Sequence, residues 1–268
     1  MKGSARRICA MLIRYLYLHK RSVPRFFEII FWPVMDLLVW GFLTLYVQGI
    51  VGDSLSKFVV FIIYGTIFWD ILYRSQQAVT ISIMEEIWQQ NILNILVSPL
   101  KIWEWLTATF LYGLLKTAVI TGVLMTITFF LYRFNTIGAL GLAVIPLAGN
   151  LLLFGWVLGI LTAGLLLIWG YSAEALIWGV PYLMQPVSAV FYPLTVLPLW
   201  LQCVAKLLPS TYVFEGIRAI MSGENLHPKY FLTAFGLNIL FFMISAIFFE
   251  WLYRRARAYG HLVRLGMY

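Results

Sequence analysis

The chain has 268 residues, of which 62% are hydrophobic, 17% aromatic and only 11% charged. Roughly a quarter of the residues in a soluble domain are charged, so this composition excludes an ordinary soluble protein. The formal net charge is +8. In a membrane protein, cytoplasmic flanks that face anionic lipid account for such a basic balance, and we do not expect a nucleic-acid partner.

Six stretches of the sequence are apolar enough to form membrane spans, for which a helix needs about 20 residues. They cover residues 29–47, 58–73, 105–132, 140–169, 175–194 and 230–253. Their apolar character is continuous rather than alternating, which indicates helices and not barrel strands. We therefore predict an all-α polytopic membrane protein with six transmembrane helices in a single domain, residues 1–268.

The distribution of basic residues predicts the orientation of these spans. Six spans place both termini on one side of the membrane, and 13 of the 19 Lys and Arg residues fall on that side. Two of them, Arg74 and Lys101, are assigned to the connection between the second and third spans. The positive-inside rule makes this side cytoplasmic. We predict a multi-pass protein of the bacterial inner (plasma) membrane with both termini in the cytoplasm.

Residues 1–28 are expected to form a cytoplasmic amphipathic segment rather than a cleaved signal peptide. Arg14 interrupts the apolar run, and no cleavage site follows it. One helical face collects apolar residues, namely Ile8, Met11, Leu12, Tyr15, Leu16 and Leu18. The basic residues lie mostly off that face, which predicts a helix that lies on the inner leaflet.

A second amphipathic helix is predicted over residues 82–98. Ser82 and Glu85 fit a capping box at its start, and Ser98 before a proline supplies its end. One face is apolar and the other polar and acidic; the residues singled out are Glu85, Glu86, Trp88, Gln89 and Ile92. Anionic lipid would repel an acidic face, which favours a protein partner. The alternative is an interfacial helix that only joins two spans.

An external hairpin of two short helices, 199–208 and 212–221, is predicted over residues 195–224. Each of these helices is too short to cross the bilayer. Prolines 193, 198 and 209 break the backbone around the first helix, and Gly223 can end the second. A hairpin that dips into the membrane and returns is tolerated only where protein or water covers its broken ends. Glu215 and Arg218 share one helical face, and a charge swap between them is expected to restore function.

Few charged residues lie within the predicted spans. Asp36 and Lys116 lie deep enough that an unpaired charge would be costly, so a mutual pair or contact with water is expected. Asp70 and Glu250 are expected at a solvated interface. Residues that could line a substrate path are Asp36, Trp40, Phe191 and Tyr192. The aromatic members could instead anchor the protein at the membrane interface.

The sequence offers no enzyme or metal chemistry. Its three histidines are scattered, no metal-ligand cluster is apparent, and neither a G-x-S-x-G nor a phosphate-binding G-x-x-x-x-G-K-[ST] motif occurs. Cys9 and Cys203 fall on opposite sides of the predicted membrane and cannot pair. If the protein uses ATP, the nucleotide site must lie on another chain.

In its overall layout the chain resembles the membrane permeases of ABC exporters, in the six-helix class of the O-antigen, teichoic-acid, Nod-factor and drug exporters. The segment "FYPLTVLPLWLQCVAKLLPSTYVFEGIRAIMSG" is similar to the family's proline-flanked hairpin. Its core is formed by Pro209, Thr211, Tyr212, Glu215 and Arg218. The segment "EEIWQQNILNILVSPLK" is similar to the family's coupling helix, where the ATPase docks.

This resemblance implies a non-catalytic permease that forms a homodimer, each copy bound to a cytoplasmic ABC ATPase that carries Mg-ATP. The first, second and fifth spans would border the substrate path, and the hairpin, with Pro209, Tyr212, Glu215 and Arg218, would close its outer end. No cofactor or metal is expected on this chain. The expected substrate is amphipathic: a lipid-linked glycan, a glycolipid or a hydrophobic drug. An importer, a channel or secondary carrier, and a non-transporting scaffold or assembly subunit are the alternatives.

Overall fold

The computed structural model describes residues 2–51, 56–135, 138, 140–224, 227–260 and 262. Within these residues the chain is helical and contains no strand. The long helices are α1 (Lys2–Lys20), α2 (Val23–Val51), α3 (Ser56–Trp88), α5 (Ile102–Tyr132), α7 (Val144–Trp169) and α11 (Pro228–Ala258). The shorter elements are α4 (Ile92–Val97), α8 (Ala175–Val187), α9 (Leu199–Ala205), α10 (Pro209–Met221) and the 3-10 turns η2 (Gly141–Ala143), η3 (Gly170–Ala173) and η4 (Leu194–Val196). The predicted all-α class is confirmed for the described residues.

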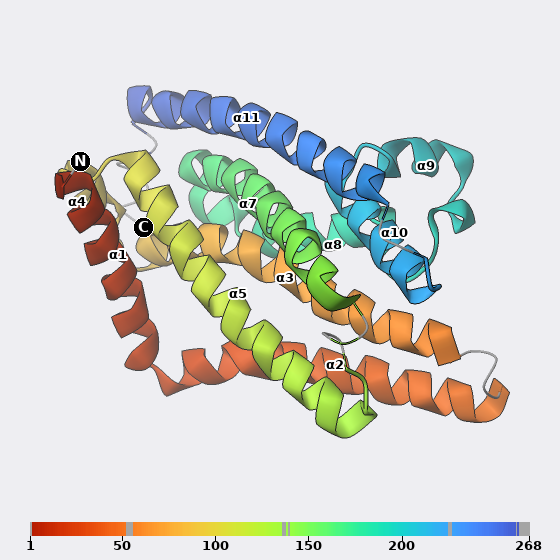
Figure 1. Ribbon diagram of the computed structural model, residues 1–268. Helices are drawn as coiled ribbons and strands as arrows, with labels where there is room; N and C mark the ends of the chain where they lie inside the picture. Colours follow the sequence, from red (N-terminus) through yellow and green to blue (C-terminus); the bar gives the residue numbers. More distant parts are fainter. Residues whose placement is uncertain are drawn as a thin grey trace.

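The long helices form a bundle whose members run back and forth along a common direction (Figure 1). Helix α1 lies across one end of this bundle, and the same end holds α4 and the last turns of α11. Helices α9 and α10 lie at the opposite end. The two predicted amphipathic segments therefore lie at one end of the bundle, and the predicted hairpin lies at the other.

Among the described residues, four helices are long and apolar enough to cross a membrane, which indicates a membrane-embedded protein. They are Ile29–Ile50, Ile102–Tyr132, Gly141–Ala173 and Pro228–Ala258. These helices correspond to the first, third, fourth and sixth predicted spans. The basic residue Arg264, counted in the C-terminal flank, lies outside the described residues.

The other two predicted spans have different boundaries in the structure. Residues 58–73 form only part of α3, which continues without a break to Trp88. Residues 175–194 do not form one helix, because α8 ends at Val187 and a non-glycine residue with positive φ, Ala189, follows. The 13 residues of α8 reach about 20 Å at 1.5 Å per residue, which is less than the bilayer core.

Small residues allow α7 to approach α3 closely. Gly155 and Gly159 on α7 are four residues apart and share one face of the helix. A Cβ atom at Gly155 would lie 2.5 Å from the carbonyl oxygen of Leu72 and 2.6 Å from Cβ of Ser75. The hydroxyl of Ser75 donates a hydrogen bond of 2.7 Å to the Leu152 carbonyl. Close backbone approach through glycine, with a polar contact beside it, is the usual way in which helices associate within lipid.

The predicted N-terminal helix is present as α1, and its apolar face is buried against protein. Tyr15 is fully buried, and Met11 belongs to the same core cluster. Nε1 of Trp105, near the start of α5, donates a hydrogen bond of 2.6 Å to the Tyr15 hydroxyl. Burial raises the pKa of the Tyr15 phenol, so the hydroxyl stays protonated at neutral pH. Much of the face predicted to contact lipid therefore packs on the bundle, although Leu16 stays exposed.

The helix start predicted at Ser82 is wrong. Ser82 lies inside α3, and its hydroxyl donates a hydrogen bond of 2.6 Å to the Ala78 carbonyl one turn earlier. The helix ends at Trp88, where Gln90 adopts a positive φ of 54°. The predicted end at Ser98 is confirmed, because α4 stops at Val97 and Ser98 is extended. The capping pattern failed because a serine within a buried helix can bond to its own preceding turn instead.

Candidate functional site: a polar cavity lined by aromatic side chains

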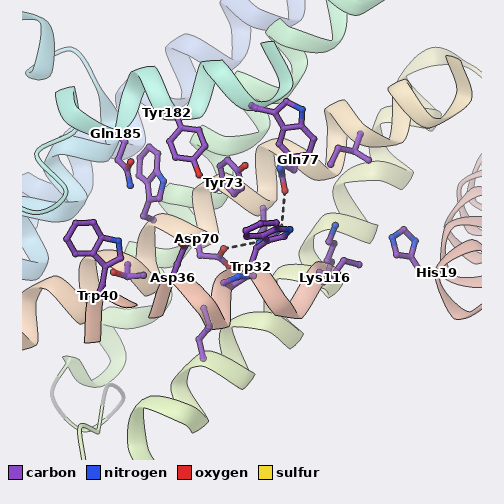
Figure 2. A pocket seen from close by; sticks show the side chains of 18 of the residues that line it. His19, Trp32, Asp36, Trp40, Asp70, Tyr73, Gln77, Lys116, Tyr182 and Gln185 are labelled. Atoms are coloured by element: carbon purple, nitrogen blue, oxygen red, sulfur yellow. Dashed lines mark hydrogen bonds and ion pairs between the residues drawn. The ribbon is translucent and has the colours of Figure 1, made fainter. Parts of the chain in front are cut away.

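The main candidate site is a cavity of about 810 Å³ enclosed largely by α2, α3, α5 and α8. Figure 2 shows side chains from these helices converging on the same space. The lining includes five tryptophans from three helices: Trp32, Trp40, Trp69, Trp88 and Trp178. It also includes charged residues from three helices: Asp36, Asp70, Arg74, Glu85 and Lys116. This combination of aromatic faces with charges suits a ligand that has both an apolar and a polar part.

One stripe of α3 supplies much of the polar lining. The cavity-lining residues of α3 include Thr66, Asp70, Arg74, Gln77, Ile81, Glu85 and Trp88. Their spacing of three or four residues places them on one side of a single helix. The spacing of this stripe is visible in the sequence, but the stripe was not predicted, because the second half of α3 was expected to form a loop and a separate helix.

Asp70 and Arg74 form an ion pair in the middle of α3. Nε of Arg74 lies 3.1 Å from Oδ1 of Asp70, and Nη1 of Arg74 donates a hydrogen bond of 3.1 Å to Gln77. Both charged residues are buried, with 8% and 6% of their surface exposed. The prediction of a solvated interface for Asp70 is therefore wrong, as is the assignment of Arg74 to a loop. Opposite charges four residues apart on a helix attract one another, and this pairing offsets the cost of burying each charge.

The four residues predicted to line a substrate path divide into three that line the cavity and one that does not. Asp36, Trp40 and Phe191 line it, and the rings of Trp40 and Phe191 stack with centroids 5.3 Å apart. Tyr192 is not among the lining residues, and its hydroxyl donates a hydrogen bond of 2.6 Å to the Pro186 carbonyl. The stacked pair joins α2 to the segment that follows α8.

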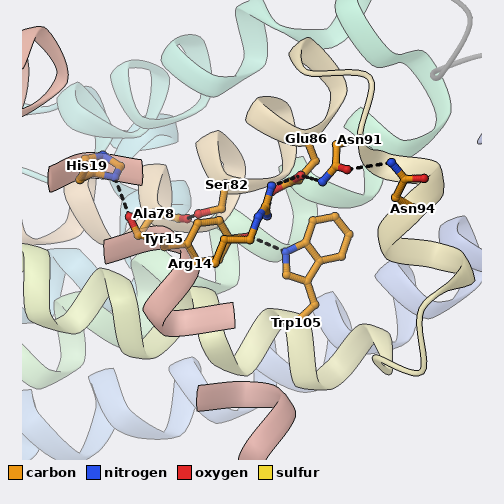
Figure 3. A network of polar contacts seen from close by, with 9 residues as sticks. All are labelled: Arg14, Tyr15, His19, Ala78, Ser82, Glu86, Asn91, Asn94 and Trp105. Atoms are coloured by element: carbon orange, nitrogen blue, oxygen red, sulfur yellow. Dashed lines mark hydrogen bonds and ion pairs between the residues drawn. The ribbon is translucent and has the colours of Figure 1, made fainter. Parts of the chain in front are cut away.

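At one end of the bundle, Glu86 forms the centre of a polar network (Figure 3). Both carboxylate oxygens bond to the guanidinium of Arg14 on α1, and Nδ2 of Asn91 donates a hydrogen bond of 2.6 Å to Oε2. The hydrogen bonds to Glu86 raise the pKa of Arg14, so the pair stays charged. This network fixes the turn between α3 and α4. We call residues 86–98, which include this turn and α4, the elbow.

Of the five residues predicted to face a protein partner, three are buried and two are exposed. Glu86 and Ile92 have no exposed surface and Glu85 is 5% exposed, so the prediction that these three residues face a partner is wrong. The acidic face was expected to meet a protein partner, but Arg14 of the same chain covers Glu86 instead. Trp88 and Gln89 are exposed as predicted.

A second ion pair attaches α1 to the start of α5. Nη2 of Arg7 lies 2.6 Å from Oε1 of Glu104, and the Ser4 hydroxyl donates to the same oxygen at 2.6 Å. Oε2 of Glu104 also accepts a hydrogen bond of 3.0 Å from the backbone nitrogen of Lys101, which caps α5. Helix α1 thus contacts both helices that border the elbow, one before it and one after it.

At the opposite end, the predicted pair of short helices is present as α9 and α10. Pro198 precedes α9, Pro209 occupies the first turn of α10, and Gly223 adopts a φ of 91° after its end, all as expected from the sequence. The hydroxyl of Tyr212 donates a hydrogen bond of 2.9 Å to the Lys206 carbonyl in the turn between the two helices.

Arg218 and Glu215 connect this hairpin to the segment after α8. Nη1 of Arg218 pairs with Oε1 of Glu215, which confirms their predicted contact. Nη2 of Arg218 also donates to the carbonyls of Ala189 and Tyr192 at 2.7 and 2.8 Å. Glu215 accepts a hydrogen bond of 2.8 Å from the backbone nitrogen of Leu194. Each side chain therefore satisfies backbone groups that the other could not.

This geometry predicts that a charge swap will not rescue the hairpin, contrary to the sequence-based expectation. Arg218→Gln should lower the free energy of unfolding by about 2–4 kcal/mol, because it leaves a carboxylate and two carbonyls with fewer donors. Glu215→Arg with Arg218→Glu should be at least as unstable, because a carboxylate at 218 faces the Ala189 and Tyr192 carbonyls. Thermal unfolding of the purified protein measures both changes.

The matched control is Arg254→Gln, which removes an arginine from a pair with Glu250 of similar spacing on the exposed surface of α11. An exposed pair is worth less than about 1 kcal/mol, so little change is expected. A double swap that unfolds at the wild-type temperature would show that the backbone contacts of Arg218 do not matter.

Among the described residues, no group of three or more His, Cys, Asp or Glu side chains could hold a metal ion. Both cysteines are free and exposed. No protein-family model matches the sequence, and no curated protein matches it.

Proposed function

We propose that this protein is the membrane permease subunit of an ABC exporter that moves an amphipathic substrate across the inner membrane. In this proposal two copies surround the path, and each binds a cytoplasmic ABC ATPase that hydrolyses Mg-ATP. The permease itself performs no chemistry. The six passages proposed are α2, α3, α5, α7, the segment 175–194 and α11, with α9 and α10 as the external hairpin and both termini in the cytoplasm. In the fifth passage α8 covers only part of the bilayer core, and the non-helical residues that follow it complete the crossing.

The observation that carries this proposal is the continuity of α3. One unbroken helix bears the polar stripe of the cavity, with Asp70 and Arg74, and ends at the elbow with Trp88. A displacement of the elbow would therefore move the cavity wall directly, because a helix transmits force along its axis better than a loop does. This is the mechanical connection that an ATP-driven transporter needs between its ATPase and its substrate path.

The exposed part of the elbow is suited to a protein partner. Its exposed residues are Trp88, Gln89, Gln90, Asn94, Val97 and Ser98. Trp88 is 41% exposed and Val97 is 87% exposed. Val97 is the last residue of α4, which lies at the same end of the bundle as α1 (Figure 1). An exposed tryptophan and a highly exposed aliphatic residue in one short segment are typical of an interface hot spot rather than of a solvated turn.

This proposal predicts that Val97→Asp will prevent stable binding of the ATPase. Loss of a hot-spot contact costs about 2 kcal/mol or more, which weakens binding by about 30-fold. We expect copurification with the ABC ATPase of the same organism to fall accordingly, and Trp88→Ala to have a similar effect. Co-expression of the two proteins followed by affinity purification measures it.

The matched control is Val196→Asp, which introduces the same charge at a 65% exposed valine of η4, near the hairpin. The control protein should retain its ATPase. If Val97→Asp binds the ATPase as well as Val196→Asp does, the elbow is not the docking site. If no ABC ATPase of the organism copurifies with the wild-type permease, the exporter assignment is wrong.

A secondary carrier is the second candidate, and the charged residues of the cavity favour it. Asp36, Asp70, Arg74 and Lys116 all line the cavity. Ionisable residues at such positions often belong to ion-coupled pathways. A carrier would transport its substrate without an ATPase and would stop when a protonophore dissipates the proton gradient, whereas the proposed exporter would require ATP.

A further inference from the structure

Asp70 lines the cavity, and one of its carboxylate oxygens is buried and accepts no hydrogen bond within the part of the chain that the structure describes. This atom is Oδ2 of Asp70. The other oxygen, Oδ1, accepts the bond from Arg74, and the whole residue is only 8% exposed. A buried acceptor without a donor is costly, and the usual explanation is a ligand or water that supplies the donor.

The charges around this oxygen select the kind of donor. The cavity lining that the structure describes contains three carboxylates, those of Asp36, Asp70 and Glu85, but only two cationic side chains, Arg74 and Lys116. These five side chains together have a net charge of −1. A neutral hydroxyl donor would satisfy Oδ2 but leave this charge unbalanced, and an anionic ligand would increase the imbalance. A monocation meets both requirements.

The aromatic residues of the cavity favour the same choice. Trp32 and Trp40 project from α2, and Tyr73 and Tyr182 project from α3 and α8 into the space that Asp70 borders (Figure 2). The faces of indole and phenol rings attract cations electrostatically, most strongly where water is excluded. The same rings offer apolar surface to the rest of an amphipathic molecule.

We propose that this cavity is a binding site for a monocationic amphipath, an amine whose ammonium group is held by the carboxylates of Asp70 and Asp36. The apolar body of the ligand packs against the tryptophans of α2. This inference rests on the proposed function, because it names the substrate class that the cavity would accept. It concerns the permease alone and requires no ATPase for its test.

The test compares three molecules that share an octyl chain and differ only in the head group: octylammonium, octyl β-glucoside and octyl sulfate. The full-length permease is held in nanodiscs of neutral lipid, and quenching of tryptophan fluorescence is followed at concentrations below micelle formation. We expect saturable binding of octylammonium only. The glucoside and the sulfate should give the linear response of partition into lipid.

Two neutralising variants connect the binding to the proposed atoms. Asp70→Asn and Asp36→Asn should each raise the Kd for octylammonium by at least about tenfold, the effect expected for loss of a poorly solvated charge partner. Glu250→Gln, which removes a partly exposed carboxylate of α11 outside the lining, should leave the Kd unchanged. Because Asp70→Asn also leaves Arg74 without its partner, Asp70→Asn with Arg74→Gln keeps the cavity charge unchanged as a second test, and it should still bind octylammonium weakly.

Several results would overturn the inference. These are saturable binding of the glucoside or the sulfate in preference to octylammonium, a linear response to all three molecules, and equal octylammonium affinities in wild-type and Asp36→Asn proteins. If the Asp70 variants do not fold, the head-group selectivity of the wild-type protein and the Asp36→Asn result decide the matter. An ATPase that copurifies with a permease unable to bind octylammonium would refute this site while leaving the exporter proposal in place.

Discussion

Replacing Arg14 by glutamate is expected to lower the free energy of unfolding by about 3 kcal/mol, the lower end of the range for breaking a buried ion pair. The lower end applies because the Arg14 side chain is 31% exposed, whereas its partner Glu86 is completely buried. The change leaves a buried carboxylate facing a second one. It should also release α1 from the elbow, since Glu86 connects these two elements.

The measurement is thermal unfolding of the purified protein, together with ATPase-dependent transport where a partner is found. Arg6→Glu is the matched control, because it reverses the same charge at an exposed position of the same helix. Arg14→Glu combined with Glu86→Arg should recover part of the stability, but not all, since Asn91 would lose its acceptor. An Arg14→Glu protein that unfolds at the same temperature as Arg6→Glu would show that the pair does not hold α1.

Substitution of Gly155 is expected to separate α3 from α7. Gly155→Ala should lower the free energy of unfolding by about 1–3 kcal/mol, because overpacking forces the helices apart. The added Cβ would lie 2.5 Å from the Leu72 carbonyl oxygen, which belongs to the backbone and cannot move without displacing α3. Gly155→Leu should be more severe and should prevent accumulation of folded protein.

Gly149 provides a matched control on the same helix. A Cβ atom there meets nothing within 4 Å, so Gly149→Ala should be neutral or slightly stabilising. Both alanine variants can be compared by thermal unfolding in the same detergent. Equal unfolding temperatures would mean that the close approach of α3 and α7 is not required for stability.

The second predicted span is shorter than the helix that contains it, because its end was predicted from local hydropathy alone. Hydropathy correctly identified an apolar helix from residue 58, but it placed the end near Tyr73 because charged and amide residues follow. In the structure α3 continues for 15 more residues, to Trp88. The charged residues are tolerated because Asp70 pairs with Arg74 and Glu86 pairs with Arg14. The second of these partners lies 72 residues away in the sequence, so no local window could have included it.

The sequence by itself determined the class of protein, most of the long helices and the breaks of the hairpin. These features depend on local quantities: the summed hydropathy of about 20 residues, and prolines that cannot continue a helix. Only the tertiary structure decided which polar residues face a cavity and which are covered by another helix. Glu85 and Glu86 are adjacent and chemically alike, yet the first lines the cavity and the second is enclosed by α1. Their difference arises because neighbouring residues on a helix point about 100° apart and meet different helices, whose positions are set by packing over the whole chain.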